Sequence, residues 1–262
     1  MALVMGVINV TPDSFSDAGQ CLDHEAAIAR GHALIVDGAD VIDVGGESTR
    51  PGADPVPVEE ELRRVLTVVE ALAPHVRISI DTRKPAVAEA AIAAGATLLN
   101  DVSAELYPVA AAAGPAVGFV AMHMLGDPRT MQADPSYDDV VTDVREFLVR
   151  RADAATDAGV EEVWIDPGIG FGKTPAHNLS LLKHLNVLVS TGYPVLIGTS
   201  RKRFLGGLLA DADRPRPADP VPVDDRLEGS VASAVWAMVQ GVRMVRVHDV
   251  RATVHAAKVV AG

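Results

Sequence analysis

The sequence predicts a single-domain (β/α)8 (TIM) barrel, an α/β fold, over residues 1–262. Eight short apolar runs alternate with stretches of helical spacing along the chain, and this strict order is typical of a parallel sheet closed into a barrel. The length of 262 residues also matches the usual size of roughly 250 residues for this fold. The alternative is a doubly wound open sheet, but no Gly-x-Gly-x-x-Gly turn follows the first run.

The predicted strands lack alternation of apolar and polar residues, as expected for strands buried on both faces of a parallel sheet. They are Leu3–Ile8, Asp40–Val44, Val76–Ile80, Thr97–Leu99, Gly118–Met122, Glu162–Ile165, Pro194–Ile197 and Arg243–Val247.

Helical spacing of apolar residues predicts a helix after each strand, and several of these stretches end at a glycine. The predicted helices are His24–Asp37, Pro57–Ala73, Pro85–Ala94, Leu106–Ala113, Tyr137–Ala158, Ala176–Ser190, Leu227–Gln240 and Ala252–Val260. The Pro-rich segment Ala212–Asp225 is expected to be an insertion or surface loop rather than a linker between domains.

Composition excludes several classes of function. A net charge of -12 argues against nucleic acid and anionic membranes as partners. A single cysteine, Cys21, excludes an intrachain disulfide and a multi-cysteine metal site. No apolar run reaches the roughly 18 residues of a membrane span, and the N-terminus has no basic leader region. We therefore expect a cytoplasmic protein.

Polar residues follow every predicted strand, where barrel enzymes carry their catalytic groups. One such residue is usually a turn former or a helix cap, but all eight strands ending this way predict an active site. Carboxylates, an amide and a lysine suit a heterocycle that carries both donors and acceptors. The residues are Asn9, Asp43, Asp81, Asn100 with Asp101, His123, Asp166, Ser200 with Arg201 and Lys202, and Arg246 with His248 and Asp249.

The last strand also predicts an anion site. Arg246 and His248 lie one residue apart and are expected to face the same side. With the basic stretch 201–203, they would focus positive charge in an acidic chain. The long loops after the first two strands, about 10–20 and 46–55, contain Gly and Pro and are expected to act as mobile lids.

Eight strings of residues, one for each strand, carry a resemblance to a known family. They are Asn9–Asp17, Asp43–Ala53, Ser79–Thr82, Asn100–Ser103, Met122–Met124, Asp166–Lys173, Ser200–Gly206 and Arg246–Val250. In this order they resemble dihydropteroate synthase. The resemblance implies a transferase of folate biosynthesis that joins 4-aminobenzoate to 6-hydroxymethyl-7,8-dihydropterin diphosphate and releases 7,8-dihydropteroate and pyrophosphate. It also implies a pterin-binding homodimer that uses Mg²⁺ and belongs to a class of sulfonamide targets.

The resemblance further implies roles for individual residues. The pterin would be held by Asp81, Asn100, Met122, Asp166, Phe171 and Lys202, and the pyrophosphate by Asn9, Thr49, Arg246 and His248. The 4-aminobenzoate site would be bordered by Phe15, Thr49, Arg50, Pro51, Phe171 and Ser200. Asn9 would contact the metal, and the catalytic groups would be Asp17, Asp43, Asp81 and Lys202.

Three departures from the family pattern stand out. Ala18-Gly19 and Ala104-Glu105 each replace a pair of glycines, and the segment 212–225 is an insertion. A non-catalytic pterin-binding paralogue with altered lids is one alternative. A corrinoid methyltransferase acting on a methyltetrahydrofolate would not need the basic residues at 200–202 and 246–248. A phosphosugar barrel enzyme would leave the set of Asp81, Asn100 and Asp166 unexplained.

Overall fold

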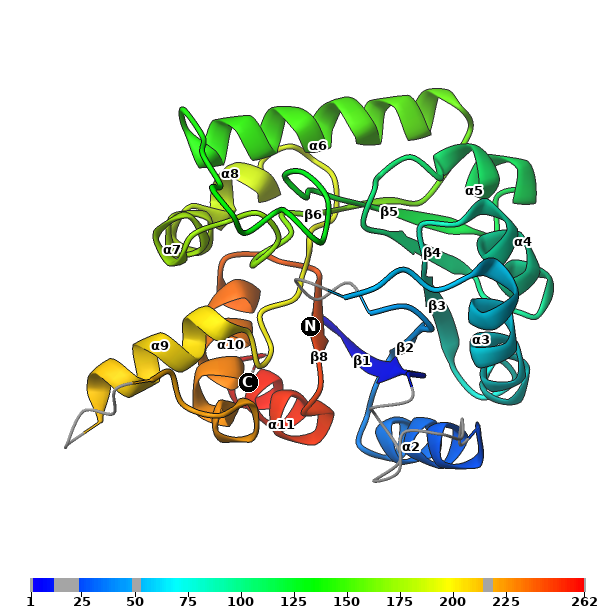
Figure 1. Cartoon of the computed structure of the whole chain (residues 1–262), viewed down its shortest axis with the longest axis horizontal. Coiled ribbons are helices and arrows are strands. Elements are labelled where there is room, and N and C mark those ends of the chain that lie inside the picture. The colour runs from blue at the N-terminus through cyan, green and yellow to red at the C-terminus, as the bar shows by residue number, and fades with distance from the viewer. Residues whose placement is uncertain (1, 12–23, 49–52, 214–218, 262) are drawn as a thin grey trace.

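The computed structural model describes residues 2–11, 24–48, 53–213 and 219–261. Parallel strands alternate with helices, and Figure 1 shows the helices arranged around the strands. The strands are β1 Leu3–Asn9, β2 Val41–Gly45, β3 Arg77–Asp81, β4 Leu98–Asp101, β5 Gly118–Met122, β6 Val163–Asp166, β7 Leu196–Ile197 and β8 Met244–Val247. The eight strands predicted from the apolar runs are therefore confirmed.

The order of the strands shows how the sheet closes. Neighbours follow the order β6-β5-β4-β3-β2-β1-β8-β7, so that β1 lies between β2 and β8. A parallel bridge between Ile165 and Val195 connects β6 to the residues that lead into β7. This arrangement is a nearly closed barrel, and it excludes the doubly wound sheet.

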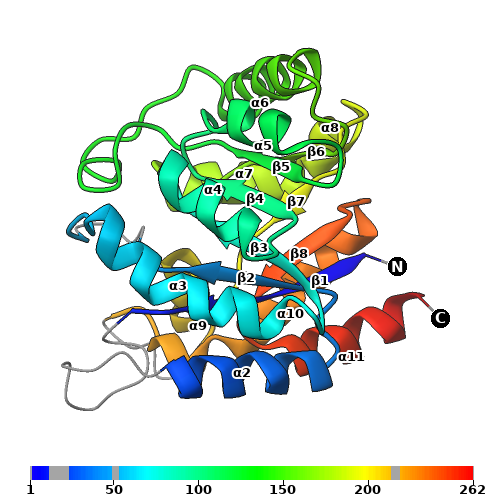
Figure 2. The ribbon, with the colours of Figure 1, turned by 90° about the vertical axis from the view of Figure 1, so that its right-hand side faces the viewer.

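The helices cover the outer face of the barrel, and α11 and α2 both contact β1 (Figure 2). Their bounds are α2 His24–Val36, α3 Val58–Leu72, α4 Pro85–Ala93, α5 Tyr107–Ala113, α6 Val140–Asp157, α7 Pro175–Lys183, α8 Leu185–Val189, α9 Arg203–Ala212, α10 Leu227–Val239 and α11 Val250–Ala261. Within the described part of the chain, no helix is long and apolar enough to cross a membrane.

Two helical regions differ from the prediction. The helix expected over 176–190 is divided into α7 and α8, because His184 adopts a φ of -113° and a ψ of 29° between them. Helix α9 was not predicted, since the pair Gly206-Gly207 weakens the local helical preference. Burial of Phe204 and Leu205 against the rest of the fold compensates for that weakness.

Apolar side chains fill the middle of the barrel interior. This interior layer consists of Met5, Val41, Leu98, Val120, Trp164, Leu196 and Met244. A larger core lies between the strands and the helices and includes Ile42, Leu72 and Phe119. Because successive strand residues face opposite sides, the residue two positions after each member of the interior layer also points inward.

Candidate active site

Several of the next inward positions, toward the carboxyl ends of the strands, are polar. Asp43 stands two residues after Val41, and Asn100 two residues after Leu98. The same step leads from Val120, Trp164 and Met244 to Met122, Asp166 and Arg246. Asp81 and Asn9 are the last residues of their strands, β3 and β1. The barrel therefore brings many of the predicted site residues into one layer.

Asp43, Asp81 and Arg246 form a carboxylate–arginine cluster in this layer. Arg246 donates from Nε to Asp43 Oδ2 at 2.6 Å and from Nη2 to Asp81 Oδ2 at 2.9 Å. Burial, followed by the negative charge of Asp43, raises the pKa of Asp81 to about 7, although Arg246 opposes this shift. Asp81 therefore exchanges a proton near neutral pH.

Asn100 extends the cluster along the polar layer. Its side-chain Nδ2 lies 3.3 Å and 3.5 Å from the two carboxylate oxygens of Asp43. Its Oδ1 atom is buried and has no hydrogen-bond partner among the described residues. A buried acceptor left in this state costs about 1–3 kcal/mol, so it marks a position where a donor of a ligand would be stabilised.

Asp166 and Lys202 form the opposite side of the layer. Asp166 Oδ1 accepts a hydrogen bond from the Gly168 backbone N–H at 2.7 Å. Burial raises the pKa of Asp166, and the charge of Lys202 offsets part of that rise. Lys202 Nζ donates to the Ile169 carbonyl and lies 4.7 Å from the centre of the Phe171 ring. Burial lowers the pKa of Lys202 to about 8, so this lysine remains largely charged at neutral pH.

The ends of β7 and β8 meet through Ser200 and His248. The Ser200 hydroxyl oxygen accepts from the His248 backbone N–H at 3.1 Å and lies 3.0 Å from His248 Nδ1. Arg201 forms a two-point ion pair with Asp249, at 2.6 Å and 3.0 Å. The count of basic residues in the sequence therefore overstates the local positive charge, because carboxylates neutralise both Arg201 and Arg246.

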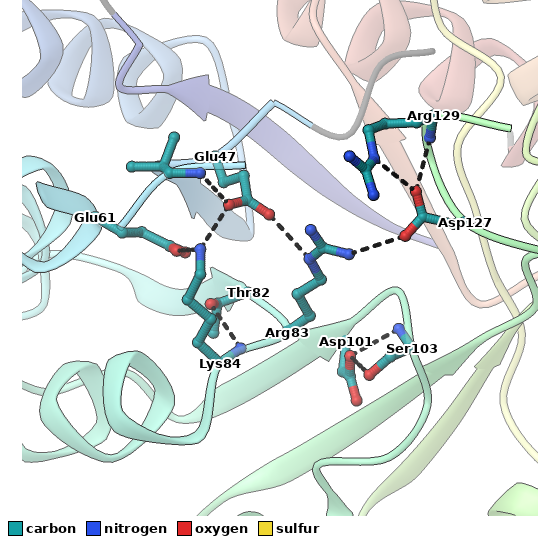
Figure 3. Close-up of polar contacts among 10 residues, drawn as sticks. Glu47, Glu61, Thr82, Arg83, Lys84, Asp101, Ser103, Asp127 and Arg129 are labelled. Atoms are coloured by element: carbon teal, nitrogen blue, oxygen red, sulfur yellow. Dashed lines mark hydrogen bonds and ion pairs between the residues drawn. The ribbon is translucent and has the colours of Figure 1, made fainter. Parts of the chain in front are cut away.

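An ion-pair network fixes the exit of β2 (Figure 3). Lys84 Nζ donates to Glu47 Oε2 at 2.6 Å and also to Glu61. Arg83 Nε donates to Glu47 Oε1 at 2.9 Å. Glu47 also accepts from the backbone N–H of Val56 at 2.8 Å, which ties the two ends of the second βα loop together. No sequence motif predicted this network.

Several predicted site residues lie outside the described residues, namely Phe15, Asp17, Thr49, Arg50 and Pro51. Most of the first predicted lid, about 10–20, and residues 49–52 of the second lie there too, so the mobility of both lids stays a prediction.

The second departure from the family pattern has a structural consequence. Ala104 adopts a φ of 55°, in the left-handed region that favours glycine. Glu105 accepts a hydrogen bond from Arg151 of α6. The Glu105 carboxylate, which replaces a glycine of the family pattern, therefore contacts helix α6 on the outside of the barrel.

Comparison with known proteins identifies the family. The profile described as "Pterin binding enzyme" matches residues 5–248. The dihydropteroate synthase of Escherichia coli (strain K12) is 45% identical over 263 residues, which cover 98% of this chain and 90% of that protein. This chain belongs to the dihydropteroate synthase family.

Solved structures of dihydropteroate synthases agree with this assignment. The Xanthomonas albilineans enzyme with 4-aminobenzoic acid has a TM-score of 0.88 at 47% identity, covering 98% of this chain and 91% of that one. The Yersinia pestis enzyme in a complex with a sulfonamide drug has a TM-score of 0.89 at 43% identity, with coverage of 99% and 93%. The predicted activity is confirmed: as a member of this family, the chain is a transferase of folate synthesis. The methyltransferase and phosphosugar alternatives are excluded.

Proposed function

We propose that the inward polar layer binds the pterin of 6-hydroxymethyl-7,8-dihydropterin diphosphate, to which the enzyme joins 4-aminobenzoate. The observation that carries this proposal is the buried Asn100 Oδ1 atom, which has no hydrogen-bond partner among the described residues. A pterin ring presents N–H donors on its pyrimidine edge and a carbonyl acceptor beside them. Asn100 and Asp166 accept from the donors, while Lys202 donates to the carbonyl.

Apolar contacts complete the pterin site in this proposal. Met122 is buried at the end of β5, and Phe171 lies beside the ammonium group of Lys202. Both would contact the faces of the ring. Lys202 has three N–H donors, so one can turn toward the pterin carbonyl while another remains on Ile169.

The pyrophosphate is assigned to Asn9, Arg246 and His248. Strand β1 pairs directly with β8, so the ends that carry these residues are neighbours. Arg246 is anchored by Asp43 and Asp81, which fix the plane of its guanidinium group. Thr49 is expected to add a further contact from the second loop.

A Mg²⁺ ion fits this site through Asn9 and the pyrophosphate itself. No group of three or more His, Cys, Asp or Glu side chains able to hold a metal occurs among the described residues. Mg²⁺ typically keeps several waters and binds through few protein groups plus substrate phosphates, so a single amide oxygen is a suitable donor set. When bound, the ion would neutralise charge on the leaving pyrophosphate.

The carboxylate–arginine cluster acts on the bond that breaks. The C–O bond of the pterin methylene breaks and its electron pair leaves with pyrophosphate, while the 4-aminobenzoate nitrogen forms the new C–N bond and loses a proton. With Asp43 and Asp81 both ionised, the cluster carries a net negative charge and stabilises positive charge at the methylene. Asp17 is the remaining expected catalytic group, and attack by the amine requires chiefly positioning.

Ser200 and Phe171 are the described residues that we assign to 4-aminobenzoate. Phe15, Thr49, Arg50 and Pro51 are expected to complete that site. Sulfonamides are the inhibitor class expected to compete here, in keeping with the drug complex of the Yersinia pestis relative.

Release of pyrophosphate tests the reaction. We expect release only when the pterin diphosphate, 4-aminobenzoate and Mg²⁺ are all present. Arg246→Ala should slow turnover while binding of a pterin without pyrophosphate stays nearly unchanged. Equal weakening of both ligands would contradict the pyrophosphate assignment, and folded wild-type protein that releases none would indicate a non-catalytic paralogue.

We also propose that the enzyme is a homodimer. An apolar groove lies between α7, α9 and α10, and Leu208 and Trp236 at this groove are 41% and 47% exposed. Contiguous exposed apolar surface is typical of an interface, and a second copy of the chain would cover it. Leu208→Glu should halve the mass measured by light scattering, whereas Val36→Glu, an exposed residue of α2, should leave it unchanged. The cytoplasmic location stays a prediction, which cell fractionation would test.

A further inference from the structure

The segment that connects β6 to α7, residues 167–174, has an unusual backbone path. Gly168, Gly170 and Gly172 have φ angles of 61°, 84° and 64°, so alternate residues are left-handed. A Cβ atom at Gly168 would lie only 1.9 Å from the carbonyl oxygen of His123. Such a path cannot satisfy its carbonyls through regular helix or strand hydrogen bonds, so it depends on partners from elsewhere.

Side chains supply those partners for five consecutive carbonyls. Lys173 Nζ donates to Gly168 O at 3.1 Å and Phe171 O at 3.0 Å, Lys202 Nζ to Ile169 O, Gln132 Nε2 to Gly170 O at 2.7 Å, and Tyr137 Oη to Gly172 O at 2.7 Å. Two of the five carbonyls therefore depend on one ammonium group, that of Lys173.

Lys173 is enclosed, with only 2% of its surface exposed. Besides the two carbonyls, its Nζ lies 2.9 Å from His123 Nδ1 and 3.4 Å from the His123 carbonyl. Burial lowers the pKa of Lys173 well below its ordinary value, and the nearby charge of Asp166 opposes this shift. In its ammonium form the group has three N–H donors, which match the two loop carbonyls and an unprotonated Nδ1. Burial, followed by the charge of Lys173, lowers the pKa of His123 to about 3, in agreement with a neutral imidazole.

The contacts of Lys173 lead directly to two residues of the pterin site. The carbonyl of Gly168 accepts from Lys173, while the N–H of the same glycine donates to Asp166 Oδ1 at 2.7 Å. The Gly168 carbonyl also accepts from the Phe171 N–H at 3.0 Å, and Lys173 holds the carbonyl of Phe171. Removal of the ammonium group would therefore take a donor from the carbonyl of the glycine whose N–H orients Asp166, and from the carbonyl of the residue that carries the aromatic ring.

We propose that Lys173 is a positioning residue of the pterin site, which fixes the 167–172 backbone and thereby sets the carboxylate of Asp166 and the ring of Phe171. This inference rests on the proposed function, because that proposal assigns Asp166 and Phe171 to the pterin. Lys173 itself is enclosed by the loop, so it acts through these two residues.

The test compares Lys173→Met with a matched control, Lys84→Met. Lys84 is likewise a partly enclosed lysine, but its partners are the carboxylates of Glu47 and Glu61 rather than the carbonyls of the 167–172 segment. Calorimetry with 6-hydroxymethylpterin should show the Kd of Lys173→Met raised about tenfold to a hundredfold. Lys84→Met should lower the thermal unfolding temperature and leave that Kd within about twofold.

Coupling to Asp166 separates a positioning role from general loss of stability. Because Asp166 carries part of the effect of Lys173, the double variant Lys173→Met/Asp166→Asn should lose less pterin affinity than the product of the two single losses. Independent, multiplicative losses would overturn the proposal. So would an unchanged Kd for Lys173→Met when Asp166→Asn binds weakly, whereas an unchanged Kd for Asp166→Asn would instead refute the pterin assignment.

A measurement on the unaltered enzyme covers the case in which Lys173→Met fails to fold. Nitrogen NMR of the histidines should show the His123 proton on Nε2, with no titration from about pH 5 to 8, where an ordinary histidine changes charge. A His123 that titrates in this range, or that carries its proton on Nδ1, would overturn the proposed arrangement of donors.

Discussion

The two ends of the barrel interior use their charged residues in opposite ways. At the amino-terminal end, Glu162 accepts two hydrogen bonds from Arg77, at 2.6 Å and 2.8 Å, and one from Trp164 Nε1 at 2.7 Å. At the carboxyl-terminal end, Asp43 and Asp81 share the single guanidinium group of Arg246. At one end a carboxylate is fully paired, while at the other two carboxyl groups compete for one cation.

The pKa values of Glu162 and Asp81 shift in opposite directions because the two carboxyl groups differ in how fully they are paired. Burial alone would raise the pKa of Glu162, but hydrogen bonds from Arg77 and Trp164 outweigh burial and lower it. Burial and the charge of Asp43 raise the pKa of Asp81 to about 7. The contacts at the amino-terminal end therefore stabilise the fold. The buried carboxyl groups at the carboxyl-terminal end lower the free energy of unfolding, and a bound ligand can offset that loss.

The largest effect is expected in the apolar layer between these ends. Leu196 is fully buried, and the next inward residue of its strand is Gly198 rather than a site residue. Leu196→Ala should reduce the free energy of unfolding by about 2–5 kcal/mol, measured by urea denaturation, because it leaves a cavity. Pterin affinity of the folded variant should stay unchanged. A parallel loss of affinity would contradict the division of the barrel interior into a part that stabilises the fold and a part that binds the ligand.

Asp166→Asn should weaken pterin binding and leave the stability of the fold nearly unchanged, the opposite of Leu196→Ala. Pterin binding should weaken by about 2–4 kcal/mol in calorimetry, since an amide cannot accept from two adjacent N–H donors as a carboxylate does. The free energy of unfolding should not fall by a comparable amount, because burial already disfavours the ionised Asp166. Affinity for 4-aminobenzoate should change less than pterin affinity. Unchanged pterin affinity would remove Asp166 from the pocket.

The contribution of Asp81 to the free energy of unfolding should depend on pH. Because its pKa is raised in the folded state, its contribution is fully present below the ordinary value of 3.8 and is lost as pH rises through about 7. Asp81→Asn should therefore flatten the decline in unfolding free energy over this interval, measured by urea denaturation at several pH values. An identical decline in the variant and the wild type would contradict the shift.

The smallest effect is expected at Glu162, whose contribution to stability depends on pH in the opposite direction to that of Asp81. Its pKa is lowered, so its contribution is present above the ordinary value of 4.5 and is lost as pH falls through the folded value. The side chain is 36% exposed, so Glu162→Gln should cost only about 1 kcal/mol or less at neutral pH. Pyrophosphate release should keep its wild-type rate, and a variant that slows it would link this contact to catalysis.

Much of the fold and the inventory of the site could be predicted from the sequence. Strands buried on both faces must be apolar throughout, so β1 and β5 were recognisable as continuous runs. The chain turns at the ends of the strands, where polar residues are needed. Asn100 and Asp166 were therefore recognisable as candidate site residues. The division at His184 and the helix containing Gly206-Gly207 were not predictable, because packing overrode weak local preferences there.

The sequence by itself determined the residue types, the order of the strands and the family motifs. Only the tertiary structure decided which groups meet. Arg246 reaches Asp43 across 203 positions of the chain because closure of the barrel brings β8 near β2. The partners of Lys173 are three backbone carbonyls and one imidazole nitrogen. Since every residue has a carbonyl, the sequence carries no mark of the ones that an ammonium group will bind, and the folded backbone path makes that selection.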